Sequence, residues 1–314
     1  MQEKNPSSAA KVNKFKEHAR SVIDHYFGSK PRRIEHRSAG LSNLVFAVSH
    51  KEGDFVVRIS PDAGSLNVFL KEQWAESAAR KAGVPTAEIL EVGSSVIPFP
   101  YMIVRKVDGS NGLNHEKRRD IVRQMGSHAA VINSIKTHGF GSTFDWSKNR
   151  LSKNETWKEY LENEYGFGKR IETLAKLSLI EKAQSKELQR IMRSAASMRP
   201  KAVLAHSDVR LKNVMADENG KVTAIIDWDN SISTIGAEWE LSIALHDLGI
   251  DEKQLFLEGY GIKPKKMADA LPLIKAFNML NYTQEAERLA AKNDKRSLDM
   301  LRMRFSGAFD LYSI

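Results

Sequence analysis

Residues 203–230 constrain the fold and chemistry of this 314-residue chain more than any other stretch. Two apolar runs, residues 203–205 and 222–226, have the composition of short buried strands. Between them the sequence Asp-Glu-Asn-Gly at 217–220 is typical of a turn, because glycine adopts a positive φ without strain. The sequence therefore predicts a hairpin in which the two apolar runs pair with each other.

Polar side chains follow each of these two runs. His206, Asp208 and Asn213 come after the first run, and Asp227 and Asp229 after the second, so the hairpin would gather carboxylates in a small space. Mg²⁺ suits such a site, because it takes few protein oxygen ligands and keeps waters and phosphates. The spacing from Asp208 to Asn213 matches the kinase catalytic loop, and Asp227 stands where the metal-binding Asp follows. The alternative is an acidic hairpin whose carboxylates are only solvated.

The same residues resemble a known family. His-Ser-Asp at 206–208, Asn213 and Ile-Asp-Trp-Asp at 226–229 are similar to the aminoglycoside phosphotransferase and choline kinase-like superfamily, as is the continuation at 236–241. The resemblance implies that Asp208 faces the attacking hydroxyl and that Asn213 and Asp227 bind Mg²⁺. It gives His206 and Asp229 supporting roles. Protein kinases usually carry His-Arg-Asp and Asp-Phe-Gly instead.

The resemblance also implies a fold and a domain organisation. It predicts an α+β, bilobal protein-kinase-like fold, with a small antiparallel sheet in the N-terminal lobe and a larger, mainly helical C-terminal lobe. Residues 1–105 would form the nucleotide-binding lobe and residues 106–314 the catalytic and substrate lobe, with ATP in the cleft.

Arg58 is the informative residue of the N-terminal half, because it interrupts the apolar strand at 55–59. The resemblance implies that it contacts the nucleotide phosphates, and arginine can bind two phosphate oxygens at once. Glu72 on the helix expected at 66–82 is its implied partner, and Glu76 is the competing choice. The alternative is an arginine that points to solvent.

Two further segments match nucleotide-binding positions of the family. Gly40, Ser42 and Asn43 stand where a loop would cover the phosphates, although the sequence is neither Gly-x-Gly-x-x-Gly nor a Walker motif. Arg105 and Val107 stand at the hinge, where backbone groups would bind the adenine edge. Either segment could also be a plain turn.

Helical periodicity and strand alternation cover most of the remaining chain. Strands are expected at 44–48, 55–59, 89–92 and 101–104. Helices are expected at 9–27, 66–82, 116–135, 161–179, 181–198, 265–278 and 295–309.

Composition excludes several classes of protein. There is no cysteine, so disulfides and thiolate metal sites are absent. No apolar run approaches the ~20 residues of a membrane span, and no signal-peptide core is present, so a cytoplasmic protein without membrane partners is expected. The net charge is +9, but basic residues are scattered and lack interleaved aromatics, which disfavours nucleic acid and favours a nucleotide.

The predicted function is ATP-dependent phosphorylation of a small-molecule hydroxyl by a monomer or homodimer. Similarity at 139–141 and Trp157 to hygromycin-type enzymes favours an aminoglycoside acceptor and antibiotic resistance, with Glu155, Glu159, Glu162, Glu164, Glu238 and Glu240 as candidate acids. Another small alcohol, a sugar or a macrolide is the alternative acceptor. An inactive nucleotide-binding scaffold and a protein kinase are alternatives of other classes. No Ala-Pro-Glu segment follows Asp227, which disfavours a protein kinase.

Overall fold

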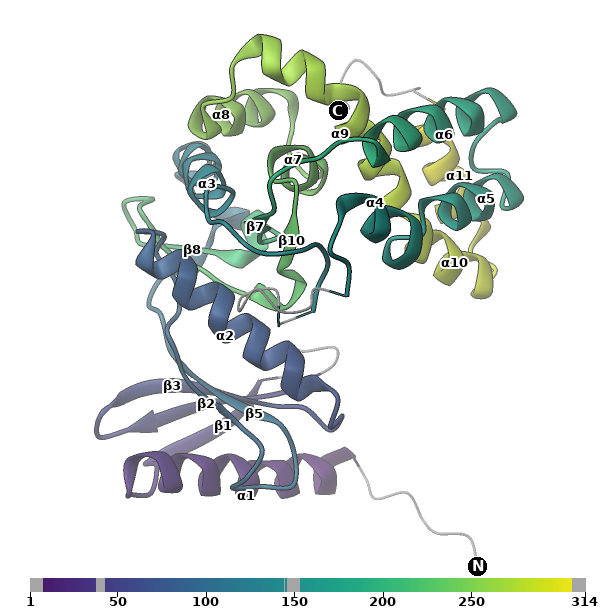
Figure 1. Ribbon diagram of the computed structural model, residues 1–314. Coiled ribbons are helices and arrows are strands. Elements are labelled where there is room, and N and C mark those ends of the chain that lie inside the picture. The colour runs from purple at the N-terminus through teal and green to yellow at the C-terminus, as the bar shows by residue number, and fades with distance from the viewer. Residues whose placement is uncertain (1–7, 38–42, 144, 146–152, 307–314) are drawn as a thin grey trace, which may run out of the picture. The chain divides into compact units, whose positions relative to one another are not determined.

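The computed structural model describes residues 8–37, 43–143, 145 and 153–306 (Figure 1). The chain divides into two compact units. The first consists of Met1–Gly109 with Thr223–Asp229, and the second of Ser110–Val222 with Asn230–Ile314. The first unit is therefore built from two separate stretches of sequence.

The first unit contains a five-stranded antiparallel sheet with the strand order β1-β2-β3-β5-β4. Buried apolar side chains alternate along its strands, because successive residues of a strand point to opposite faces of the sheet. The small antiparallel sheet predicted from the sequence is confirmed. Its strands are β1 (Arg33–Arg37), β2 (Leu44–His50), β3 (Gly53–Ile59), β4 (Ile89–Gly93) and β5 (Tyr101–Arg105).

Two helices cover the two faces of this sheet (Figure 1). Helix α1 (Ser8–Phe27) packs on one face and α2 (Ser65–Lys81) on the other. Neighbouring residues of β5 separate the two cores, since Ile103 belongs to the α1 side and Met102 to the α2 side. The α1 core includes Phe15, Val22, Ile23, Phe46, Val57 and Ile59, and the α2 core is formed by Phe69, Ile89 and Met102.

The second unit is mainly helical (Figure 1). One of its cores joins aromatic side chains from several helices, among them Trp157, Trp239 and Phe277. Its helices are α3 (Arg118–Ile132), α4 (Trp157–Glu159), α5 (Phe167–Lys176), α6 (Lys182–Ala196), α7 (Ala237–Ala244), α8 (Ile250–Tyr260), α9 (Pro264–Asn281), α10 (Thr283–Ala291) and α11 (Lys295–Phe305). Its short strands are β6 (Ser110–Asn111), β7 (Val203–Ala205), β8 (Val214–Ala216) and β10 (Ile232–Thr234). Strand β9 (Val222–Ile225) begins in the second unit, and its residues from Thr223 onward belong to the first.

The predicted pairing of residues 203–205 with residues 222–226 is wrong. Strand β7 instead pairs antiparallel with β10. The turn at 217–220 follows β8, a strand that the sequence analysis missed, and is closed by the Asp217 N–H, which donates to the Lys221 carbonyl at 3.0 Å. The apolar runs were recognised correctly, but short runs do not reveal their partners.

The helix predicted at 161–179 is also only partly correct. The chain forms a π-helical turn at Tyr160–Glu164 and then breaks at Gly166, whose φ of 63° no continuous right-handed helix contains. Helix α5 starts after this break. The helix expected at 295–309 ends at Phe305, and its last three residues lie outside the described part of the chain.

No helix among the described residues combines the length and the apolar composition that a membrane crossing requires. The longest, α1, spans 20 residues and carries charged side chains along its length.

Helices α3 and α8 approach each other closely, and two glycines allow this contact. A Cβ atom on Gly126 would lie 2.0 Å from the Phe256 carbonyl oxygen, and one on Gly259 would lie 1.9 Å from the Arg123 carbonyl oxygen. Both clashes involve backbone atoms, which cannot move aside as a flexible side chain can. Glycine is therefore a packing requirement at both positions.

We predict that Gly126→Ala destabilises the protein by at least about 1–3 kcal/mol, because the added methyl group forces the two helices apart. The matched control is Gly168→Ala, since a Cβ on Gly168 of α5 would meet nothing within 4 Å. That control should be neutral or stabilising by up to about 1 kcal/mol, as alanine favours a helix over glycine. Thermal unfolding of both variants checks this, and equal melting temperatures would contradict the packing argument.

Candidate active site

The loop after β7 carries the predicted catalytic residue, Asp208. Ser207 in this loop has a φ of 63°, a left-handed conformation that residues other than glycine seldom adopt. Such a conformation persists only where the surrounding contacts determine it. The loop ends in a 3-10 turn at Leu211–Asn213, and the Asn213 N–H donates to the Arg210 carbonyl at 2.8 Å.

Two residues of α7 hold this loop in place. The buried Glu240 carboxylate accepts the His206 N–H at 2.7 Å and the Ser207 N–H at 3.1 Å. The Trp239 indole N–H donates to Ser207 Oγ at 2.9 Å. Burial raises the pKa of Glu240 to about 7, although the backbone hydrogen bonds act in the opposite direction. Contacts from α7 therefore determine the conformation of Ser207.

The His206 side chain also supports this loop. Its side chain is fully buried, and Nδ1 accepts the Asp208 N–H at 3.2 Å. This geometry agrees with the supporting role that the family resemblance implies for His206.

Asp208 is a buried carboxylate with compensated charge. Oδ1 accepts a hydrogen bond from Arg210 Nε, and Oδ2 lies 3.1 Å from Lys212 Nζ and 2.8 Å from Asn213 Nδ2. Burial acts to raise the pKa of Asp208, but Arg210 and Lys212 together hold it below its ordinary value. Asp208 is consequently ionised at neutral pH.

Asn213 is oriented by Asp208. Its Nδ2 donates to the Asp208 backbone carbonyl at 3.0 Å as well as to the carboxylate. Within the described part of the chain, no hydrogen-bond donor reaches Asn213 Oδ1. The amide therefore presents an oxygen that a cation or water can use.

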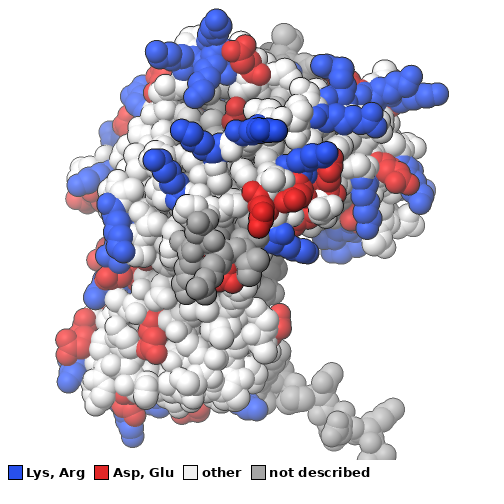
Figure 2. Space-filling view, in the orientation of Figure 1, with Lys and Arg blue, Asp and Glu red and all other residues white. Residues whose placement is uncertain are grey.

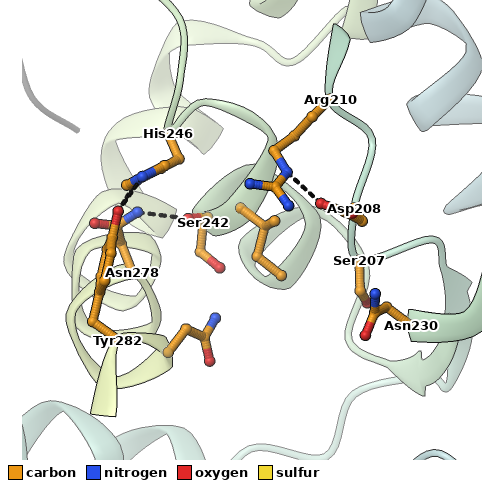
Figure 3. A pocket seen from close by; sticks show the side chains of 10 residues that line it. Ser207, Asp208, Arg210, Asn230, Ser242, His246, Asn278 and Tyr282 are labelled. Atoms are coloured by element: carbon orange, nitrogen blue, oxygen red, sulfur yellow. Dashed lines mark hydrogen bonds and ion pairs between the residues drawn. The ribbon is translucent and has the colours of Figure 1, made fainter. Parts of the chain in front are cut away.

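Asp208 also lines a pocket of about 290 Å³ in the second unit (Figure 3). Ser207 and Arg210 belong to the same wall, and side chains of α7 and α9 form much of the rest. Figure 3 shows Asn278 directed at the Ser242 carbonyl, to which its Nδ2 donates at 2.7 Å. A pocket of this size next to an ionised carboxylate can hold a small hydroxylated molecule.

The first unit contains the predicted pair of Arg58 and Glu72. Arg58 lies beside Met102 in the sheet register and therefore points to the face that α2 covers. Its Nη1 is 2.6 Å from Glu72 Oε2, and its side chain is 17% exposed against 2% for Glu72. The competing Glu76 instead binds Arg80 and the Thr86 hydroxyl. The pairing is confirmed, and a solvent-facing Arg58 is excluded.

Glu72 is held in an environment that disfavours its charge. Burial raises the pKa of Glu72 to about 7, and Arg58 acts against this shift. Its Oε1 is buried and has no hydrogen-bond partner among the described residues. The ion pair with Arg58 therefore carries most of the compensation for this buried carboxylate.

Asp227 and Asp229 belong to the first unit, together with Arg58 and Glu72. Asp227 has a φ of 68° and precedes a 3-10 turn at Trp228–Asn230. After burial and Arg58, the negative charges of Asp229 and Asp227 add to the raised pKa of Glu72. These four charged groups thus form one electrostatic group, and the structure places Asp208 and Asn213 in the other unit.

The structure gives less information on the other residues that were predicted to bind the nucleotide. Gly40 and Ser42 lie outside the described residues, and Asn43 is half-buried directly before β2. Arg105 Nε lies 3.3 Å from Glu88 Oε2, with which it forms an ion pair, and the Arg105 backbone N–H donates to the Glu88 carbonyl. No described residue forms a hydrogen bond with the backbone of Val107, so its N–H and C=O groups are available to a nucleotide base.

Sequence reasoning missed the groups that set the state of Asp208. Arg210 and Lys212 follow Asp208 by two and four residues, so their spacing offered a signal that was not used. Glu240 was considered only as an acid for the acceptor, whereas its carboxylate is occupied by the backbone of the loop. The pocket residues on α9 gave no signal, because each looks like an ordinary helix residue.

We predict that Arg58→Met destabilises the protein by about 3–5 kcal/mol at pH 8, because Glu72 keeps a buried charge without its partner. A carboxyl whose folded pKa lies above its unfolded value loses stabilising free energy as the pH rises from the unfolded pKa to the folded one. The loss caused by Arg58→Met should therefore be smaller at pH 5 than at pH 8. Denaturant unfolding at both pH values measures this.

The matched control is the double variant Arg58→Met/Glu72→Gln, in which no buried carboxylate remains. Its deficit relative to the wild type should depend less on pH than that of Arg58→Met. Equal deficits for Arg58→Met at pH 5 and pH 8 would show that the Glu72 charge is not the cause.

The chain is similar to one protein family and to solved structures of phosphotransferases. The sequence profile of the phosphotransferase enzyme family (APH) matches residues 33–271. No curated protein matches the chain significantly. One similar structure is a thermostable mutant of the aminoglycoside phosphotransferase APH(4)-Ia in ternary complex with AMP-PNP and hygromycin B, with 17% identity, a TM-score of 0.65, and coverage of 92% of this chain and 96% of that one.

Two further structures are similar over nearly their whole length. The macrolide 2′-phosphotransferase MphH from Brachybacterium faecium has 14% identity and a TM-score of 0.60, with 90% of this chain and 97% of that one covered. The GDP complex of aminoglycoside 2′-phosphotransferase-IIIa has 15% identity and a TM-score of 0.66, with 93% and 99% covered. The predicted α+β, protein-kinase-like fold is thereby confirmed. Because the family profile matches well over half of the sequence, the chain belongs to the phosphotransferase enzyme family.

Proposed function

We propose that this phosphotransferase moves the γ-phosphate of ATP to a hydroxyl group of a small molecule, with Mg²⁺ bound beside the phosphates. The observation that carries the proposal is Asp208, an ionised carboxylate that lines a pocket of small-molecule size. The similar structures hold AMP-PNP with hygromycin B in one case and GDP in another, which supports a nucleotide donor and a small acceptor.

Asp208 accepts a hydrogen bond from the acceptor hydroxyl and directs its oxygen at the phosphate. Each carboxylate oxygen has two acceptor sites, so Lys212 and Asn213 occupy both sites of Oδ2, while Arg210 leaves one site of Oδ1 for the hydroxyl. Its lowered pKa makes Asp208 a weak base, and its main contribution is therefore to orient the hydroxyl. The Glu240 contacts keep the loop rigid while it does so.

Arg58 is the proposed phosphate contact. In the described part of the chain its guanidinium bonds only through Nη1, to Glu72 and to Met102 Sδ. The remaining N–H groups can bind phosphate oxygens in the fork geometry of arginine. Glu72 fixes the direction of the guanidinium, and the unpaired backbone of Val107 would bind the base.

Asn213 and Asp227 are the proposed Mg²⁺ ligands. Asn213 fits, because its Oδ1 is unused and its amide is held by Asp208. Mg²⁺ commonly takes one or two protein oxygens and completes its shell with phosphates and waters, which the pair of Asn213 and Asp227 would provide for. When bound, Mg²⁺ offsets the charge that develops on the transferred phosphate.

We predict that Asp208→Asn leaves Mg-ATP affinity near the wild-type value while turnover falls by about 10²–10⁴-fold, since the hydroxyl loses its charged acceptor. Calorimetry measures the affinity, and ADP release measures turnover. The wild type should be assayed on aminoglycosides, macrolides, choline and sugars, with mass spectrometry to detect an added phosphate. Near-normal turnover by Asp208→Asn would remove Asp208 from this role.

We predict that Asp227→Ala abolishes turnover with every acceptor and weakens Mg-ATP binding, because a metal ligand is lost. Asp269→Ala is the matched control, since Asp269 is an exposed carboxylate on α9. Titration calorimetry with Mg-ATP, together with Mn²⁺ binding followed by electron paramagnetic resonance, measures the effect. If Asp227→Ala bound Mg-ATP as tightly as Asp269→Ala does, the metal assignment would be wrong.

A further inference from the structure

The pocket beside Asp208 has a distinctive chemical lining. Amides come from Asn230, Asn278 and Asn281, and hydroxyls come from Ser207, Ser242 and Tyr282. One carboxylate, one guanidinium, one imidazole and the apolar Ile243 complete the lining. The pocket is therefore polar, but most of its polar groups carry no charge.

The single carboxylate of the lining is not available to a cation. Asp208 already contacts Arg210, Lys212 and Asn213. A positively charged acceptor would have to compete with two fixed cations for one carboxylate, and the repulsion between like charges opposes its binding.

The far wall of the pocket adds no carboxylate to the lining. His246 contacts the Tyr282 hydroxyl (Figure 3). It also contacts the Arg304 guanidinium. Burial and the charge of Arg304 lower the pKa of His246 to about 4, so its imidazole is neutral at pH 7. The neighbouring Asp247 lies 3.3 Å from Arg210 Nη1 and 3.3 Å from His246 Nε2, and it does not line the pocket.

Four of the six acids that the sequence analysis offered for a cationic acceptor have contacts outside the pocket. Glu240 accepts backbone N–H groups, Glu159 caps the start of α4, and Glu164 accepts the Asn154 amide at 2.7 Å. Glu162 lies 4.0 Å from Lys158 at the surface. Figure 2 shows acidic side chains gathered on one face of the second unit with Lys and Arg side chains around them. None of the six candidate acids lines the pocket.

The hydrogen-bonding capacity of the lining suits hydroxyl groups. Arg210 offers donors only, whereas Asn278 uses its Nδ2 on the Ser242 carbonyl and leaves Oδ1 as an acceptor. A hydroxyl both donates and accepts, so it can bind either kind of group, while an ammonium only donates. The volume of about 290 Å³ lies at the small end of ligand pockets, which typically span roughly 300–1,000 Å³. One ring of sugar size fits this description.

From this geometry we infer that the pocket binds the phosphate acceptor, and that the acceptor is a neutral, hydroxyl-rich molecule of the sugar type and not a polycationic amino sugar. The inference rests on the proposed phosphotransfer and narrows its substrate class.

The primary test compares acceptors of similar size and different charge. Neutral sugars from monosaccharides to maltotriose, and kanamycin as the amino-sugar probe, are assayed with wild-type enzyme and Mg-ATP by ADP release and mass spectrometry. We expect at least one neutral sugar to gain a phosphate with a kcat/KM at least about tenfold above that of kanamycin, a difference of about 1.4 kcal/mol. Equal or faster phosphorylation of kanamycin would overturn the inference, and so would failure of every neutral sugar.

A charge placed in the pocket provides the second test. Asn281 Oδ1 accepts the Tyr165 hydroxyl at 2.9 Å, while Nδ2 has no partner among the described residues. Asn281→Asp keeps the accepting oxygen and adds a carboxylate oxygen in place of Nδ2. It should raise the kcat/KM ratio of kanamycin to neutral sugar by roughly tenfold, as expected for one new, partly desolvated ion pair.

The matched control is Asn219→Asp, which makes the same charge change on an exposed turn outside the pocket. Its acceptor ratio should equal that of the wild type, and thermal melting confirms that both variants fold. An unchanged ratio in folded Asn281→Asp would show that the pocket is not the acceptor site. If the wild type did not bind Mg-ATP, the phosphotransfer proposal itself would be refuted. If it bound Mg-ATP but phosphorylated kanamycin faster than neutral sugars, only the inference of a neutral acceptor would be refuted.

Discussion

The buried carboxylate of Glu240 is the interaction on which the active-site loop depends. It accepts the two consecutive N–H groups that the left-handed turn at Ser207 directs inward. Without an acceptor, each buried N–H would cost about 1–3 kcal/mol. No strand or helix partner could satisfy them, because a left-handed residue interrupts regular pairing. Together with the Trp239 indole, which donates to Ser207 Oγ, this carboxylate connects α7 to the loop between β7 and Asp208.

The sequence supported the fold class and the site residues unequally. Arg58 stood out because it is a charged residue among Phe55, Val57 and Ile59, and such a residue is costly to bury unless it has a partner. The family resemblance supplied Glu72 as that partner, and the structure shows the ion pair on the face of the sheet that α2 covers. The resemblance was sufficient here because both residues stand at positions that match the family.

Pairing between short strands could not be inferred in the same way. Three apolar residues in β7 satisfy any antiparallel partner of similar length, and β10 follows β9 by only a few residues. The state of Asp208 was equally hidden, since a pattern of residue types does not show which cations will bind its oxygens. The pocket required knowledge of how α7 and α9 pack, which depends on distant contacts such as that between Asn278 and Ser242. Family resemblance supplied the catalytic motif but not these local determinants.

The division of the first unit between two stretches of sequence affects the order in which this unit can fold during synthesis. The Ile225 N–H bonds to the Pro85 carbonyl at 2.9 Å, across more than a hundred intervening residues. During synthesis on the ribosome, residues 1–109 therefore emerge long before Thr223–Asp229 can join them. Contacts so far apart in sequence form late and slowly. Until then the nascent sheet lacks the segment that carries Asp227, so a fragment ending near residue 109 has Arg58 and Glu72 but lacks that carboxylate.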